Sequence, residues 1–397
     1  MKGTGMVNAT ATSATVQWRV QLFKLNYDRQ EIDAAMDVIE SGWITMGEKT
    51  IRFEESFADF LGRNTYCTAT SSGTAALHMA LLAAGVGPGD QVIVPSLTFV
   101  ADLNVVRLVG ASPVLVDCTS YDDWNISPEG IAAAVTPRTT AVLVVHYAGY
   151  ACDMDAIEAA IHEASGGRTI CLIEDAAHAP GADYRGRACG TIGHVGCFSF
   201  FTNKNLSVGE GGMFATRSEE LHEKGRYLRS HGMTALTLDR HKGRSISYDV
   251  VLPGLNYRMD EMRAAIGLVQ LAKLPEANRR RMQLVESYRR LLDNTPQLSV
   301  PFQNHTPGKP SYHIFPVLLD RGVDRAQVIA GLREQGIQSS IHYPSFHGFT
   351  AYGNAGFPPT PIAEDISHRE LTLPLFPTMT SAQVEYVCSS LQRLLDR

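Results

Sequence analysis

Three short stretches of the sequence combine residue types that could do chemistry together. TSSGTAALHMAL (70–81) opens a predicted helix with hydroxyl groups and a glycine. CLIEDAAHAPGA (171–182) ends an apolar strand with two adjacent carboxylates, and CFSFFTNKNLSVGEGGMF (197–214) contains a single lysine, Lys204. Each stretch has an ordinary structural explanation when it is taken alone, so their combination carries the functional interpretation.

The first stretch predicts a phosphate site. Backbone amides at a helix start carry partial positive charge, and the hydroxyls of Ser72 and Thr74 could bind a phosphate beside them. The alternative is a simple N-cap, because Ser and Thr are favoured there in any case. The chain has neither a Walker lysine after this turn nor a G-x-G-x-x-G fingerprint, which weighs against nucleotide-triphosphate and dinucleotide binding.

The second stretch places Glu174 and Asp175 at the end of a predicted strand, and His178 follows three residues later. Open α/β sheets bind ligands at the carboxyl ends of their parallel strands. An acid there could hold a protonated heteroaromatic nitrogen, and the histidine could stack on a ring or donate a hydrogen bond to it. The alternative is an acidic residue that caps the following turn.

The third stretch raises the possibility of a covalent bond to Lys204, which has no acidic neighbour until Glu210. A lysine that forms a Schiff base must be neutral part of the time, and burial promotes this by disfavouring the ammonium form. The alternative is a surface lysine. The glycines at 209, 211 and 212 are expected to let the backbone pass close to a bound ring. A phosphate site, a strand-end acid and a lysine are together the parts that pyridoxal 5′-phosphate requires.

Composition limits the class of protein. The chain has 397 residues, 44% of them hydrophobic and 19% charged, which predicts a globular protein of about two domains. A net charge of −6 argues against a nucleic-acid-binding protein, and no apolar run approaches the roughly 18 residues of a membrane span. Seven scattered cysteines without a C-x-x-C pair predict reduced thiols in a cytoplasmic protein, with no metal site.

The elements that must position the three stretches alternate between apolar strands and helices. Strands are predicted at 65–70, 91–95, 112–117, 140–146, 169–175, 195–200 and 212–216, with helices at 29–41 and 50–61 and from 74, 100, 128 and 153. This alternation predicts crossover units and a sheet buried on both faces. Residues 1–21 are rich in Thr, Ala and Ser and predict a flexible extension, followed by a large domain at 22–257.

The remaining residues, 258–397, predict long helices and a small C-terminal domain. Two helices are expected at 258–274 and 276–292, and the basic run at 279–281 is expected to be a solvated face. After a connection at 301–310, a strand is predicted at 312–319, a helix at 325–335, a strand at 338–343 and a final helix at 381–395.

In addition, the chain resembles the sugar-nucleotide aminotransferases of the DegT/DnrJ/StrS type from about residue 22 to its end. The matching segments are, in order, SGWITMG, SSGTAALHMALLAAGVGPGDQVIVPSLTFVA, VVHYAGYACDMDAI, IEDAAHAPGADYRG, GCFSFFTNKNLSVGEGG, LNYRMDEMRAA and LPLFPTMT. The resemblance implies an α/β protein of the fold type I PLP-dependent aminotransferases, with a mostly parallel seven-stranded sheet in a large domain and a smaller α+β C-terminal domain. It also implies a homodimer with active sites at the interface.

The same resemblance implies roles for individual residues. Lys204 matches the lysine that holds the cofactor aldehyde, and Asp175 the partner of the pyridine nitrogen. The remaining implied cofactor contacts are Gly73, Thr74 and Ser199 at the phosphate, Phe99 and His178 at the ring, and Asn256, which reaches the phosphate of the other subunit. Two departures from the family pattern are the sequence FTNKN around the lysine and Glu210 in place of a common aspartate.

The activity implied is transfer of an amino group from L-glutamate to C4 of a dTDP- or UDP-linked 4-keto-6-deoxyhexose, with pyridoxamine phosphate as the intermediate cofactor form. The segments AAH and VVHYAG resemble the enzymes that act at C4. Alternatives are C3 amination of a 3-keto sugar, a non-catalytic PLP-bound regulatory protein, and a nicotinamide-dependent sugar oxidoreductase. Candidates for sugar-nucleotide contacts, each with an equal structural alternative, are Thr45, Met46, Arg229, His231, His313, His342 and Tyr343.

Overall fold

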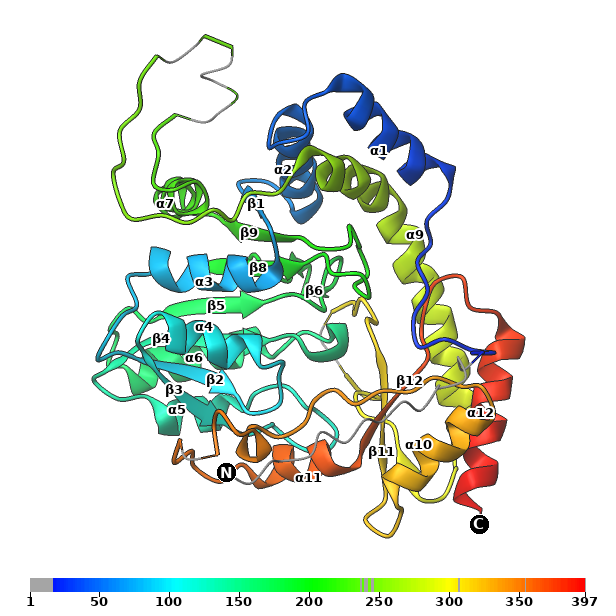
Figure 1. Ribbon diagram of the computed structural model, residues 1–397. Helices are drawn as coiled ribbons and strands as arrows, with labels where there is room; N and C mark the ends of the chain where they lie inside the picture. Colours follow the sequence, from blue (N-terminus) through cyan, green and yellow to red (C-terminus); the bar gives the residue numbers. More distant parts are fainter. Residues whose placement is uncertain are drawn as a thin grey trace, which may run out of the picture.

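A seven-stranded sheet forms the centre of the protein in a computed structural model that describes residues 17–235, 238, 242–243, 246–305, 308–353 and 355–396 (Figure 1). Its strand order is β1-β9-β8-β5-β4-β2-β3. The strands are β1 (Tyr66–Thr70), β2 (Gln91–Pro95), β3 (Ser112–Val116), β4 (Thr139–Val145), β5 (Cys171–Asp175), β8 (Val195–Ser199) and β9 (Gly212–Thr216). Only β9 runs antiparallel to its neighbours, so the mostly parallel seven-stranded sheet is confirmed.

Helices cover both faces of this sheet, as the near-continuous apolar strands require. One hydrophobic core lies under α2 (Glu48–Leu61), α5 (Pro128–Ala134), α6 (Met154–Ala164) and the first half of α9 (Glu261–Leu292). The other lies under α3 (Gly73–Ala83), α4 (Ala101–Leu108) and α7 (Glu219–Arg229). Outside these layers are α1 (Arg29–Ser41), the short helix η1 (Tyr147–Gly149), and the hairpin of β6 (Asp183–Tyr184) and β7 (Arg187–Ala188).

α9 is one continuous helix of 32 residues, whereas two helices were expected from the proline at 275. Proline removes one backbone donor and strains the preceding turn at a cost of about 3 kcal/mol. The buried residues Leu271, Leu274 and Ala277 lie on both sides of it, and their packing outweighs that cost. The expectation of a fully solvated basic run is also wrong, because the Arg281 side chain is 5% exposed.

The C-terminal unit contains an antiparallel three-stranded sheet in the order β10 (Leu298–Ser299), β11 (Phe315–Leu319), β12 (Glu370–Leu373). It packs with α10 (Arg325–Glu334), α12 (Ser381–Leu395) and the second half of α9. α11 (Pro361–Arg369) contacts β11, whereas Phe346 of the short helix η2 (Phe346–Gly348) packs in the core under α3 and α4. The strand predicted at 338–343 is wrong, since only Ser340 forms an isolated bridge, to Thr372. The sequence did not predict β12, because polar residues alternate with leucines in it although all of them are buried.

The predicted N-terminal extension falls largely outside the described residues. Within its described part, Val20 is 1% exposed and forms a bridge with Ile337, so this end of the segment packs on the C-terminal unit. All seven cysteines are free thiols. Over the described ranges, every helix falls short of the length and apolarity that a bilayer crossing requires.

Candidate active site

A cavity of about 380 Å³ lies where β1, β2, β5 and β8 end and α3 and α4 begin. Crossover connections bring these strand ends to one edge of the sheet, which is why segments far apart in the sequence meet there. The small C-terminal unit adds one wall. The lining includes Ser72, Gly73, Thr74, Thr98, Phe99, Asp175, His178, Ser199, Phe201, Asn203, Lys204, Glu210, His342 and Tyr343.

The start of α3 has the N-cap that was one interpretation of its hydroxyl groups, and it also lines the cavity. Ser72 is the N-cap, and its Oγ accepts a hydrogen bond of 3.1 Å from the Ala75 amide. The amides of Gly73 and Thr74 belong to the first turn and lack intrahelical acceptors. A Cβ at Gly73 would lie 2.8 Å from Cβ of Ser199, so only glycine lets β8 approach this closely. The helix start and the Ser199 hydroxyl therefore lie side by side at one end of the cavity.

Gly212 likewise allows β9 to approach the start of α3 closely. A Cβ there would lie 2.4 Å from the carbonyl oxygen of Ser72, and one at Gly211 would lie 2.7 Å from a methyl group of Val208. These two glycines thus allow protein segments to pack against each other, whereas the sequence suggested that they make room for a bound ring. Gly209 has a left-handed φ of +88°, which favours glycine at the turn after Lys204.

The two adjacent carboxylates at the end of β5 lie in different surroundings. Successive residues of a strand point to opposite faces of the sheet, so Asp175 lines the cavity while Glu174 does not. The Asp175 Oδ1 atom accepts a hydrogen bond of 2.8 Å from the Ala177 amide. Burial raises the pKa of Asp175, and this amide and the nearby Lys204 oppose the rise. An acid with these neighbours can hold a cationic nitrogen in a low-dielectric site.

Lys204 lies in the turn between β8 and β9 and faces the same cavity. Burial lowers its pKa to about 8, against the opposing charge of Asp175. A substantial fraction of the amine is therefore neutral near neutral pH, as a nucleophile or base requires. Lys204 and Asp175 thus line the same cavity, near enough for the charge of Asp175 to act on the amine.

His178 and Tyr343 connect the large unit to the small one. Nδ1 of His178 accepts a hydrogen bond from the Ala148 amide, so its Nε2–H donates to the Tyr343 hydroxyl at 3.0 Å. Burial, and then the charge of Lys204, lower the pKa of His178 well below its usual value, which keeps the ring neutral. The ring of Phe99 lies 5.7 Å from that of Tyr343 and is 54% exposed. An exposed aromatic at a cavity mouth is available to stack on a ligand.

Two further histidines lie near this wall. His342 lines the cavity, and its Nδ1 is 2.8 Å from Oγ1 of Thr372. His313 lies behind the wall with its ring centre 4.3 Å from that of His178, and its Nδ1 is hydrogen-bonded to Asn205 at 3.0 Å. Of the two, only His342 borders the cavity.

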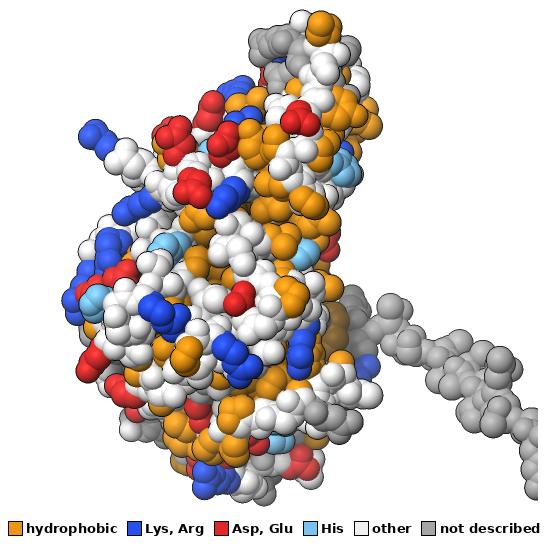
Figure 2. Space-filling model, turned by 90° about the vertical axis from the view of Figure 1, so that its left-hand side faces the viewer, with side chains coloured by type: hydrophobic (Ala, Val, Ile, Leu, Met, Phe, Trp, Pro, Cys, Tyr) orange, Lys and Arg blue, Asp and Glu red, His pale blue; other side chains and the backbone are white. Residues whose placement is uncertain are grey.

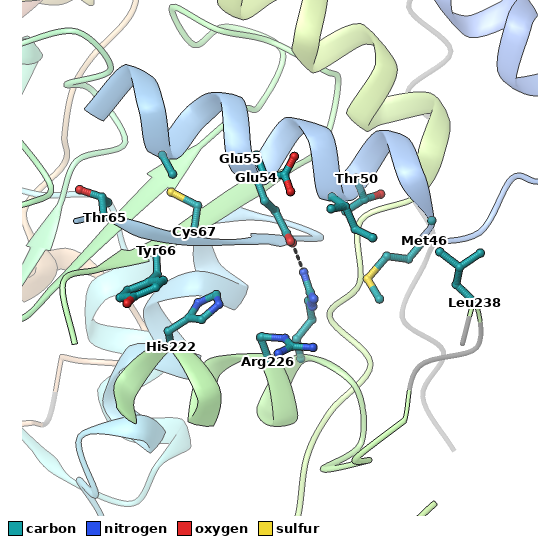
Figure 3. Close-up of a pocket in the computed structure, with 14 residues that line it drawn as sticks. Met46, Thr50, Glu54, Glu55, Thr65, Tyr66, Cys67, His222, Arg226 and Leu238 are labelled. Carbon is teal, nitrogen blue, oxygen red and sulfur yellow. Dashed lines mark hydrogen bonds and ion pairs between the residues drawn. The ribbon is translucent and has the colours of Figure 1, made fainter. Parts of the chain in front are cut away.

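The structure does not bring the other candidates into this cavity. Arg229 forms a buried ion pair with Glu54, donates to the Ala69 carbonyl at 3.1 Å, and lines a second cavity of about 390 Å³ together with Met46. Figure 3 shows this second cavity, with Glu54 projecting from α2 and His222 and Arg226 from α7. Thr45, His231 and Asn256 are exposed and border neither of the two cavities.

One acidic residue at the site was not recognised from the sequence. Asp102 lies in the first turn of α4, is fully buried, and is close enough to Asp175 for the charge of Asp175 to raise its pKa. The available signal was an acid within the apolar segment TFVADLNVV. Acids are common in the first turn of any helix, so the position alone did not separate it from helix-dipole residues.

Comparison with known proteins agrees with this geometry. The model of the DegT/DnrJ/EryC1/StrS aminotransferase family matches residues 26–392. The aminotransferase TlmJ from Streptoalloteichus hindustanus is 33% identical, with 96% of this chain and 99% of TlmJ covered and a TM-score of 0.86. DesV from S. venezuelae is also 33% identical, with 96% and 99% covered and a TM-score of 0.87. The sugar aminotransferase Spr1654 from Streptococcus pneumoniae, solved in a PLP form, is 30% identical, with 94% and 97% covered and a TM-score of 0.86. The chain therefore belongs to the DegT/DnrJ/EryC1/StrS aminotransferase family.

Proposed function

We propose that this aminotransferase moves an amino group from L-glutamate to C4 of a nucleotide-linked 4-keto-6-deoxyhexose, using pyridoxal 5′-phosphate. The observation that carries the proposal is the meeting of Lys204, Asp175 and the start of α3 in one cavity. These three groups match the aldehyde, the pyridine nitrogen and the phosphate of the cofactor, which are the three parts that the protein must bind.

The residues of the cavity fit this cofactor chemically. The first-turn amides of Gly73 and Thr74, with the hydroxyl of Ser199, would hold the phosphate. Asp175 would keep the pyridine nitrogen protonated, and Phe99 and His178 would hold the two faces of the ring. When bound, the cofactor supplies an electron sink for the carbanion that forms at the substrate carbon.

Lys204 has two tasks in this proposal. Its neutral form, favoured by a pKa of about 8, would hold the cofactor through the aldehyde. With an amino donor bound, the same amine would move the proton of the substrate Cα, as a general base and then a general acid. His178 stays neutral beside it and so adds no competing positive charge.

A second copy of the chain is proposed to complete the site. Among the described residues between α7 and α9, Ile246, Tyr248, Val250 and Val251 have exposed hydrophobic side chains. Figure 2 shows hydrophobic side chains on the part of the surface that projects at the top of the view. Such a surface favours burial against a partner. Asn256 follows this segment and is exposed in the single chain, which suits its proposed contact with the cofactor phosphate of the partner subunit.

The sugar-nucleotide half of the cavity is proposed to include His342 and Tyr343, which line it from the small unit. Support for C4 comes from the segments around His146 and His178, which resemble those of enzymes acting at that carbon. A dTDP- or UDP-linked substrate and a cytoplasmic location are part of the same proposal, the latter because all seven cysteines are free thiols.

The test of the cofactor assignment is the absorption spectrum of the purified protein after reconstitution with PLP. A band near ~420 nm that L-glutamate bleaches is expected. Lys204→Ala should lose the band, whereas Lys224→Ala, which removes an exposed lysine on α7, should keep it. A wild-type protein that stays colourless would overturn the proposal.

The test of the sugar assignment is turnover of a panel of nucleotide keto sugars, with NMR of the product to locate the new amine. An amine at C4 is expected. An amine at C3 would retain the aminotransferase and reject the proposed position.

A further inference from the structure

Asp102 is a buried acid with an incomplete set of hydrogen bonds. Its side chain is fully buried in the first turn of α4, and one oxygen, Oδ2, accepts a hydrogen bond from the Thr98 hydroxyl. The other oxygen, Oδ1, receives no donor from any described residue. The Asp175 carboxyl group lies nearby: it lines the same cavity as Thr98, and its charge acts on Asp102.

Two carboxyl groups close together inside a protein cannot both be ionised, because their repulsion is barely screened there. A single proton between them removes the repulsion and also gives the second oxygen of Asp102 a partner. The surroundings decide which group carries the proton. Asp175 accepts a hydrogen bond from the Ala177 amide and lies near Lys204, so its charged form is the better stabilised. The proton therefore belongs on Asp102.

We propose that Asp102 is a positioning residue, protonated at neutral pH, that donates a hydrogen bond to Asp175 and holds that carboxylate ionised and directed at the pyridine nitrogen of the cofactor. This inference rests on the proposed function in assigning Asp175 to that nitrogen. The existence of the proton on Asp102 depends only on the protein.

The charged and titratable groups around Asp102 and Asp175 favour a protonated Asp102 beside an ionised Asp175. Burial, and then the charge of Asp175, raise the pKa of Asp102 well above its usual value, while Lys204 opposes the rise. The Cys197 thiol on β8 and the Tyr343 hydroxyl also face both acids, and His146 at the end of β4 faces Asp175. Burial keeps both the thiol and the phenol protonated, so neither adds negative charge to the pair.

Two variants separate the hydrogen bond from the mere volume of the side chain. Asp102→Asn keeps a donor that can reach Asp175 and cannot ionise. Asp102→Leu has a similar volume and no donor. The first test uses the protein without cofactor: infrared spectroscopy should reveal the C=O stretch of a protonated carboxyl group at neutral pH, and both variants should lose that component. Glu370→Gln is the control: burial raises the pKa of Glu370 to about 8, so this acid gives a second protonated-carboxyl component at neutral pH, which the control should lose while the component of Asp102 stays in place.

The second test measures the dissociation constant for PLP at pH 6 and pH 8. We expect Asp102→Asn to bind PLP within about threefold of wild type, and Asp102→Leu to bind it about 10- to 100-fold more weakly, since a hydrogen bond to a charged group is lost. The loss should be larger at pH 6, where Asp175 without its donor takes up a proton. A purely structural role would weaken binding equally at both pH values.

Retention of the infrared component in Asp102→Asn, or PLP binding by Asp102→Leu as tight as in wild type, would overturn the inference. Should Asp102→Leu fail to fold, the infrared comparison with Asp102→Asn still decides the matter. If wild type itself does not bind PLP, the proposed function fails, and so does the role of Asp102 toward the cofactor, while the infrared result reports separately on the shared proton.

Discussion

The imidazole of His146 and the carboxylate of Glu174 form a hydrogen-bonded pair with no exposed side-chain surface, in which Nε2 and Oε2 are 2.8 Å apart. Nδ1 of His146 accepts a hydrogen bond of 3.1 Å from the Cys152 amide, so Nε2 carries the proton that is donated to Glu174. The pair joins the end of β4 to the end of β5, directly beside Asp175. It therefore holds in place the strand ends from which the active site is built.

Substitution of Glu174 by glutamine is expected to lower the free energy of unfolding by about 2–4 kcal/mol, as is usual when one partner of a buried pair is removed. The carboxylate accepts hydrogen bonds from the amides of Gly190, Ile192 and Gly193 as well as from His146. A glutamine NH₂ group would face one of these donors. Urea denaturation measures the loss.

The control for this prediction is Glu158→Gln, which affects a surface acid 3.9 Å from Arg187. It should change the free energy of unfolding by less than about 0.5 kcal/mol. Equal losses in the two variants would contradict the interpretation of Glu174 as the centre of a buried network.

Glu370 is expected to make the free energy of unfolding depend on pH, and its substitution should remove that dependence. Burial raises its pKa to about 8, against opposing hydrogen bonds from Thr372 and the His342 amide. At pH values between the usual pKa of a glutamate and 8, Glu370 is protonated in the folded protein and ionised in the unfolded chain. The contribution is therefore complete at acidic pH and is lost as the pH rises through 8.

Glu370→Gln should flatten this loss, which is on the order of a few kcal/mol between pH 5 and pH 8. Thermal or urea unfolding across that range measures it. The exposed Glu385, changed to glutamine, serves as control and should leave the slope unchanged. A wild-type slope in Glu370→Gln would assign the pH dependence to other groups.

The low pKa of Lys204 should be visible in the kinetics of cofactor binding. Only the neutral amine attacks the aldehyde of PLP. With a pKa of about 8, the second-order rate constant for reconstitution should rise about tenfold from pH 6.5 to pH 7.5 and level off above pH 8.5. Stopped-flow absorbance measures this rate. A rise that continues to pH 10 would indicate an ordinary lysine.

Phe99 is expected to contribute to cofactor affinity without contributing to stability. Because its ring is 54% exposed, Phe99→Ala should change the free energy of unfolding by less than about 0.5 kcal/mol. Loss of ring stacking should weaken PLP binding about 3- to 10-fold. Leu108→Ala is the matched control, since Leu108 is an exposed apolar residue on α4 that does not border the cavity. Unchanged affinity in Phe99→Ala would remove Phe99 from the proposed cofactor contacts.

The sequence predicted best what depends on local patterns. The order of strands and helices, and the meeting of Lys204 with Asp175, follow from periodicity and from the rule that parallel strands end at one edge of a sheet. Contacts between distant segments were not predictable in this way. Arg229 suggested a substrate contact, but its partner Glu54 lies on a helix much earlier in the chain. Asp102 was missed for the same reason, because only the fold places it beside Asp175.

α9 has a mechanical consequence for the movement of the two units. Its first half packs against α1 and α2, and its second half against α12 (Figure 1). At 1.5 Å per residue, its 32 residues form a rod about 48 Å long. The C-terminal unit, which carries His342 and Tyr343, is thus joined to the large unit by a long helix that packs against both. Any opening of the cavity wall must bend or tilt this helix, and Pro275, where the helix lacks one backbone hydrogen bond, is its most pliable point.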